Sequence, residues 1–239
     1  MLLRQSVFLT IVLIAALVLS TIIYLFVLPD FIRQGGPLVI LLITLSILLI
    51  TFILERLFTL KKARGTGSLF EFTAELNHTL QQRDVEGALS LCHKQQGSVA
   101  TVLLFALERF RQISRENLTS DRQVSELQRA LEDATSLETP LLERNLIALS
   151  TIASIATMVG LLGTTIGMIR AFRAMAHQGA PDAIQLAIGI SEALINTAGG
   201  LFAAIVGIVA YNFFTNRVDN FTYEIEEVGH RLVRHLTGT

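Results

Sequence analysis

The side chains best suited to chemistry lie in two apolar stretches, residues 151–172 and 183–214. Glu192 is the only carboxylate in either stretch, and Asn196 follows it one helical turn later. Ionisable groups cost free energy in hydrocarbon, so membrane spans retain them mainly where they face a bundle interior or an ion path. These residues therefore predict part of a membrane ion conductor.

Hydroxyl groups at helical spacing form a polar stripe on the first stretch. A hydroxyl can donate a hydrogen bond to water or to a carboxylate and can also accept one. It can instead donate to a carbonyl of its own helix one turn earlier. Both interpretations stay open for this stripe, which contains Ser154, Thr157 and Thr164, and for Thr197 in the second stretch.

Small residues form a second stripe on each stretch. Gly163 and Gly167 make a GxxxG pair, and such pairs let two helix backbones approach closely in lipid. We expect helix packing through these stripes, which are Gly160, Gly163, Gly167 and Ala171 in the first stretch and Thr197, Gly200, Ala204 and Gly207 in the second.

The composition is that of a membrane protein. Half of the 239 residues are apolar, only 16% are charged, and the mean hydropathy is +0.56. The net charge of −1 offers no electrostatic footprint for nucleic acid. Cys92 is the only cysteine, and the five histidines lack metal-ligand spacing, so we predict no disulfide, no metal site and no cofactor.

Four stretches are long enough to cross a bilayer, which takes roughly 20 apolar residues. The four are residues 7–28, residues 37–58 and the two stretches described above. The first of these could be a secretory signal, but it is longer than a typical signal core and no A-x-A-like cleavage site closes it. We therefore predict a retained helix.

Basic residues set the predicted orientation, because cytoplasmic flanks are enriched in them. Eleven of the nineteen Lys and Arg residues fall between 61 and 147, which places that region inside. The short connections 29–36 and 173–182 hold only Arg33 and Arg173 and should face outward. Both termini are then inside.

The region between the second and third spans reads as helices with apolar positions three and four apart. We expect one helix over 70–95, a second over 98–113 and a polar loop over 114–123, with a helix start near Ser120 or Asp121. A further helix from Val124 runs toward the third span, with a bend or a junction at Pro140. We interpret these apolar stripes as core packing and assign them no catalytic role.

Two strings in the late spans carry a family resemblance: VGLLGTTIGMIRAF (159–172) and GISEALINTAGGLFAAIVGIVAYN (189–212). With ERNL (143–146) and ERLFTLKKA (55–63), they resemble the MotA/TolQ/ExbB proton-channel family, and most of all its ExbB and TolQ branches. The resemblance runs from about residue 37 to the C-terminus. The N-terminal span is additional to the three-helix pattern of the best-known members.

The resemblance implies a multi-pass subunit of a bacterial inner-membrane motor in contact with membrane lipids. Such subunits form a ring, usually a pentamer, around single-span partners of the ExbD/TolR type, and proton flow energises outer-membrane transport through a TonB-like transducer. The family's pore-facing threonines fall on Thr164 and Thr197, and its glutamate falls on Glu192. Relatives often have proline where Met158 and Val206 stand, so helix kinks expected there are in doubt.

The fold expected is an all-α polytopic membrane protein whose spans extend into a cytoplasmic helical region, assembled as a ring-forming homo-oligomer. Its predicted parts are an extra N-terminal span with a short periplasmic loop (1–36), a transmembrane helix (37–60), the cytoplasmic helical region (61–147), a transmembrane helix (148–173), a periplasmic loop (174–182), a transmembrane helix (183–214) and a cytoplasmic C-terminal helix (215–239).

A titrating partner is expected because hydroxyls do not titrate near neutrality and the four predicted spans contain no aspartate. The function predicted is a channel scaffold that couples the proton motive force to TonB-dependent transport. Alternatives are a TolQ-like role in cell-envelope maintenance and a stand-alone secondary transporter, although repeated halves are not evident. An enzyme is not expected, because no nucleophile, base and orienting group share an element.

Overall fold

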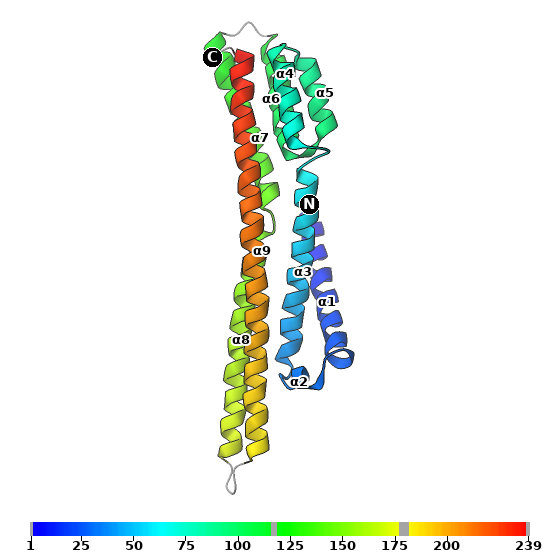
Figure 1. Ribbon diagram of the computed structural model, residues 1–239, viewed down its shortest axis with the longest axis vertical. Helices are drawn as coiled ribbons and strands as arrows, with labels where there is room; N and C mark the ends of the chain where they lie inside the picture. The colour runs from blue at the N-terminus through cyan, green and yellow to red at the C-terminus, as the bar shows by residue number, and fades with distance from the viewer. Residues whose placement is uncertain (1, 116–118, 177–181, 238–239) are drawn as a thin grey trace. The chain divides into compact units, whose positions relative to one another are not determined.

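The computed structural model describes residues 2–115, 119–176 and 182–237, with side chains from Thr10 onward except those of Ser120 and Thr237. These residues form helices and no strands (Figure 1). The helices are α1 (Leu2–Phe26), α2 (Asp30–Arg33), α3 (Leu38–Ala63), α4 (Leu69–Gln81), α5 (Val85–Gln95), α6 (Gly97–Ile113), α7 (Ser120–Glu143), α8 (Leu146–Met175) and α9 (Ala183–Thr237).

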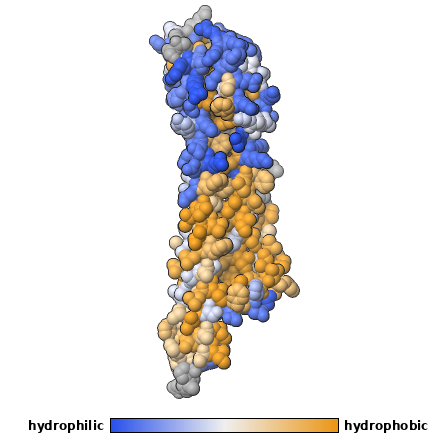
Figure 2. All heavy atoms as spheres, viewed as in Figure 1, coloured by the Kyte–Doolittle hydropathy of each residue, from blue (hydrophilic) through white to orange (hydrophobic). Residues whose placement is uncertain are grey.

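The chain divides into two compact units. We call Met1–Glu55 with Asn145–Phe213 the apolar unit and Arg56–Arg144 with Phe214–Thr239 the polar unit. Figure 2 shows hydrophobic residues over the surface of the former and hydrophilic residues over much of the latter. The all-α membrane architecture predicted from the sequence is confirmed.

Three helical stretches within the described residues have the length and composition to cross a membrane: Leu38–Ala63, Asp121–Met175 and Ala183–Leu236. The second includes α7 and α8, which are separated by Asn145 in a left-handed conformation. The described side chains of the first predicted span form a shorter apolar helix, Thr10–Phe26. Four spans therefore remain a prediction, and the predicted periplasmic loop 174–182 falls partly outside the described residues.

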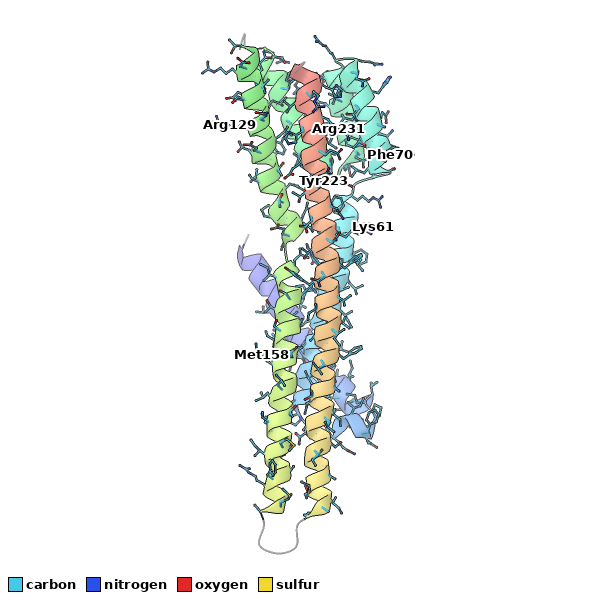
Figure 3. All side chains as sticks on the ribbon, turned by 60° about the vertical axis from the view of Figure 1, so that its left-hand side comes forward. Lys61, Phe70, Arg129, Met158, Tyr223 and Arg231 are labelled. Carbon is cyan, nitrogen blue, oxygen red and sulfur yellow. The ribbon has the colours of Figure 1, made fainter. Side chains whose placement is uncertain are left out.

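Hydroxyl side chains are among the groups that pack between helices of the apolar unit. Ser20 on α1 and Thr44 on α3 are both buried, and their hydroxyl oxygens lie 2.7 Å apart. Large apolar side chains point outward, as Met158 on α8 does at 67% exposed (Figure 3). Helices α8 and α9 run uninterrupted through Met158 and Val206, the two positions where the resemblance left helix kinks in doubt.

The polar unit has a conventional aliphatic core. Leu103 and Leu107 on α6, Leu127 on α7 and Leu232 on α9 are fully buried. Its surface carries exposed charged side chains such as Lys61, Arg129 and Arg231 (Figure 3). Burial of aliphatic area against water is the main stabilising term in such a bundle.

The single helix predicted over 70–95 is wrong, because the chain breaks between α4 and α5. Arg83 adopts a positive φ of 56°, and the Asp84 carboxylate accepts a hydrogen bond from the Gly87 amide at 2.8 Å as a helix N-cap. The apolar spacing continues across the break, so periodicity alone misses it; the Asp84 cap was the available signal.

Other junctions lie close to prediction. Helix α6 begins at Gly97, whose φ of +85° and contact with the Gly65 backbone leave no room for a side chain. Helix α7 begins at Ser120, as expected, and Pro140 lies near its end rather than at the junction. The predicted outer connection 29–36 contains the one-turn helix α2.

Candidate functional site: a polar cluster in the apolar unit

Helices α8 and α9 meet along the two small-residue stripes. A Cβ on Gly163 would overlap the Asn196 side chain, and one on Gly167 would lie 2.6 Å from the Gly189 carbonyl oxygen. Gly200 faces α8 in the same way, since its Cβ would lie 2.6 Å from the Ala156 carbonyl oxygen. Gly160 and Gly207 lie at the same contact. Only glycine permits this backbone approach.

The two family threonines meet across this contact. The hydroxyls of Thr164 on α8 and Thr197 on α9 are hydrogen-bonded to each other, and both side chains are half-buried. Each also lies within reach of the Gly160 carbonyl oxygen, at 3.3 Å and 3.4 Å. Because both side chains are partly exposed, their hydroxyls can also exchange hydrogen bonds with water or with a partner group.

The other stripe hydroxyls are bonded within their own helix. Ser154 donates to the Ser150 carbonyl at 3.0 Å, and Thr157 donates to the Ala153 carbonyl at 3.2 Å. Ser154 is exposed on α8, whereas Thr157 is half-buried. The structure thus brings Thr164 and Thr197 together and leaves Ser154 and Thr157 separate from them.

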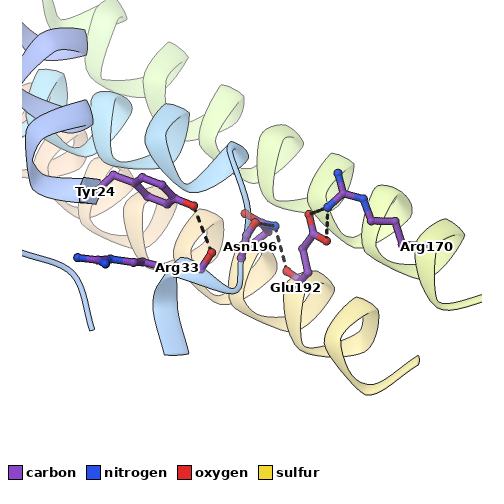
Figure 4. A network of polar contacts seen from close by, with 6 residues as sticks. Tyr24, Arg33, Arg170, Glu192 and Asn196 are labelled. Atoms are coloured by element: carbon purple, nitrogen blue, oxygen red, sulfur yellow. Dashed lines mark hydrogen bonds and ion pairs between the residues drawn. The ribbon is translucent and has the colours of Figure 1, made fainter. Parts of the chain in front are cut away.

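Glu192 is buried in an ion pair with Arg170 on α8 (Figure 4). Arg170 Nη1 lies 2.6 Å from Glu192 Oε1 and 2.5 Å from Oε2. The Glu192 side chain is 4% exposed, whereas that of Arg170 is 53% exposed. Charge-assisted hydrogen bonds of this kind are strong, and here they neutralise the one carboxylate in an apolar stretch.

Asn196 joins this pair to the turn that precedes α3. Its side chain is fully buried, and Nδ2 donates to the Gly35 carbonyl at 2.7 Å and to the Glu192 carbonyl at 2.9 Å. Gly36 adopts a φ of +72°, and a Cβ there would lie 2.6 Å from Glu192 Oε1. The turn therefore closes over the carboxylate with a residue that must lack a side chain.

The N-terminal helix holds that turn in place. The Tyr24 hydroxyl donates to the Arg33 carbonyl at 3.3 Å, and Arg33 Nη2 donates to the Leu25 carbonyl at 2.7 Å. With the Ser20 and Thr44 contact, these bonds attach α1 and α2 to α3. Helix α1 thus supports residues next to Glu192.

The two shorter motif strings also make contact with each other. Asn145 Nδ2 donates to Glu55 Oε2 at 3.3 Å within the apolar unit. Within the polar unit, the buried Arg56 side chain donates to the Leu142 carbonyl at 3.1 Å. These contacts join the end of α3 to the α7–α8 junction.

Sequence reasoning missed Arg170 and the Gly35–Gly36 turn. The signal for Arg170 was present, because it is the only charged residue in 151–172 and Glu192 is the only one in 183–214. A lone cation and a lone anion in neighbouring spans favour an ion pair. The turn gave no comparable signal. Among the described residues, no three histidine, cysteine or carboxylate side chains gather as metal ligands would.

The model of the MotA/TolQ/ExbB proton channel family matches residues 102–227. That range covers more than half of the chain and includes the threonine pair, Arg170, Glu192 and Asn196. The chain belongs to this family. Its membership confirms the resemblance inferred from the strings in α8 and α9.

Several relatives share parts of the sequence. The Tol-Pal system protein TolQ of Pseudomonas aeruginosa is 40% identical over 112 residues, which are 44% of this chain and 48% of that protein. An ExbB homolog of Methanothermobacter thermautotrophicus is 29% identical over 205 residues, 86% of this chain and 67% of the relative. The biopolymer transport protein ExbB of Xanthomonas campestris is 34% identical over 106 residues, 41% of this chain and 42% of its own length. The matches to TolQ span about half of that relative's length.

Proposed function

We propose that the protein is an ExbB-like channel scaffold in the bacterial inner membrane, where it couples the proton motive force to TonB-dependent outer-membrane transport. The observation that carries this proposal is the set of polar groups inside the apolar unit, namely the Thr164 and Thr197 pair and the buried Glu192. Polar and ionisable groups at such a place are typical of an ion path. Family membership supports protons as the ion.

The proposal includes partners, because the threonines cannot carry a proton by ionising. A single-span subunit of the ExbD/TolR type supplies a carboxylate to the path, and a TonB-like transducer receives the motion. Five copies of the chain form a ring around that subunit, in contact with lipid. The outward-facing apolar side chains of α8 and α9, such as Met158 and Phe202, support burial against lipid or further copies.

Replacing the paired threonines tests the path. Thr164→Val and Thr197→Val keep the side-chain shape but remove the hydroxyl, so assembly should survive. We expect proton entry into vesicles that carry the complex with its partner, and uptake of a TonB-dependent substrate in cells, to fall about three- to tenfold, the scale of one lost hydrogen bond.

Thr165→Val is the matched control. Thr165 is the next residue on α8, is exposed, and donates to the Leu162 carbonyl of its own helix at 2.7 Å. Its replacement should leave proton flux unchanged. Full flux and uptake in correctly assembled Thr164→Val and Thr197→Val complexes would overturn the pore assignment.

A TolQ-like role is the second candidate, and the 40% identity to TolQ of Pseudomonas aeruginosa favours it. Deletion of the gene separates the two. Loss of iron-chelate uptake with an intact outer membrane supports the ExbB-like role, whereas detergent sensitivity with normal uptake supports the TolQ-like role.

A further inference from the structure

The environment of Glu192 is built from three separate segments of the apolar unit. Arg170 approaches from α8, the Gly35–Gly36 turn closes over the carboxylate, and Asn196 ties that turn to the Glu192 backbone. The carboxylate is therefore fixed in direction as well as neutralised (Figure 4).

The two side chains of the ion pair differ in how much of their surface is exposed. The Glu192 side chain is almost wholly buried, whereas more than half of the Arg170 side chain is exposed. Both contacts to Glu192 come from Nη1, and a guanidinium carries further N–H donors on Nη2 and Nε. Arg170 can thus hold Glu192 while its outer edge faces the surroundings.

We propose that Arg170 is a positioning residue of the proton path, which fixes the direction of the Glu192 carboxylate and supplies the positive charge that lets it remain buried. Arg170 has this role only if the protein conducts protons as proposed above. Without the guanidinium, a buried anion has lost its ionic partner, and it must move or bind another cation. Either change alters a proton path that includes Glu192.

The test compares Arg170→Gln, Arg170→Lys, Glu192→Gln and the double variant Arg170→Gln/Glu192→Gln in the full complex reconstituted with its partner. Arg170→Gln should lower proton flux at least about tenfold, because breaking a buried ion pair displaces the remaining group. Arg170→Lys keeps a positive charge and should retain most of the flux, although it loses the guanidinium geometry.

The double variant separates positioning from a general structural effect. If Arg170 acts through Glu192, removing both charges lowers flux no further than Glu192→Gln alone. The double variant also leaves no unpaired buried charge. It therefore tests whether Arg170 acts through Glu192 even if Arg170→Gln fails to assemble. Arg173→Gln, an exposed basic residue one turn later on α8, is the matched control and should keep full flux.

Three outcomes overturn the inference. They are full flux in an assembled Arg170→Gln complex, losses that add in the double variant, and failure of Arg170→Lys to exceed Arg170→Gln. Failure of the proposed function is distinguishable, since the wild-type complex would then carry no proton flux at all.

Discussion

The α8–α9 contact of the apolar unit and the core of the polar unit bury different kinds of side chain. At the α8–α9 contact the apolar unit buries glycine, alanine and a few hydrogen-bonded polar groups, while large side chains such as Met158 face outward. The polar unit buries leucines such as Leu103 and Leu107 and exposes charges. The difference follows from the solvent. Water drives apolar side chains into a core through the hydrophobic effect, whereas lipid provides no such driving force.

The same difference explains where chemistry is possible. A leucine core holds no group that can exchange a proton. Where glycine lets α8 and α9 approach closely, Thr164 pairs with Thr197 and Glu192 pairs with Arg170. The region of close backbone approach between α8 and α9 is therefore also the region in which we propose the proton path.

Gly163→Leu is expected to have the largest effect, because the new side chain would overlap Asn196 and separate α8 from α9. We expect little intact complex after detergent extraction, measured by native mass and thermal stability. Even Gly163→Ala should cost about 1–3 kcal/mol, as overpacking does.

Gly199→Ala is the control for Gly163→Ala, since its Cβ would meet only Leu42 Cδ1, at 3.3 Å. It should be tolerated. An unchanged subunit count and melting temperature in Gly163→Leu would remove the distinction between glycine packing and leucine packing.

Leu107→Ala probes the other unit. Leu107 is fully buried on α6, so its truncation should destabilise the polar unit by about 2–5 kcal/mol. Denaturant unfolding measures this loss. Leu137→Ala, on an exposed leucine of α7, should change the unfolding free energy by less than about 0.5 kcal/mol. Equal losses in the two variants would contradict an aliphatic core.

Thiol labelling sharpens the comparison with no large change in stability. Burial raises the pKa of the Cys92 thiol to about 12, so the native protein should react with a maleimide at least about 100-fold more slowly than the unfolded chain.

The slow reaction of Cys92 gives the low background that a topology test by cysteine labelling needs. Gly179→Cys, at a position outside the described residues, should react from the outside of intact cells, because the distribution of basic residues predicts that 61–147 is inside.

Gln82→Cys, at an exposed position between α4 and α5, is the control and should react only after the membrane is opened. Labelling of residue 179 only from the cytoplasmic side would reverse the proposed orientation. Rapid labelling of native Cys92 would show that its segment opens readily.

The sequence by itself determined the class of the protein, because hydropathy over some twenty residues reports a membrane span without reference to any other segment. It also determined the family, through the strings around Thr164 and Glu192. Local periodicity located most helices in the same way, and it failed at Arg83 and Asp84, where a cap interrupts a spacing that continues across the break.

Only the tertiary structure decided which polar groups meet. Arg170 and Glu192 are 22 residues apart, and Asn196 lies 161 residues from Gly35. No local pattern encodes those distances, because they depend on how closely the glycine stripes let α8 and α9 approach and on how α1 holds the turn before α3. Polar residues in an apolar span indicate that each has a hydrogen-bond or ion-pair partner. Helix packing determines which residue that partner is.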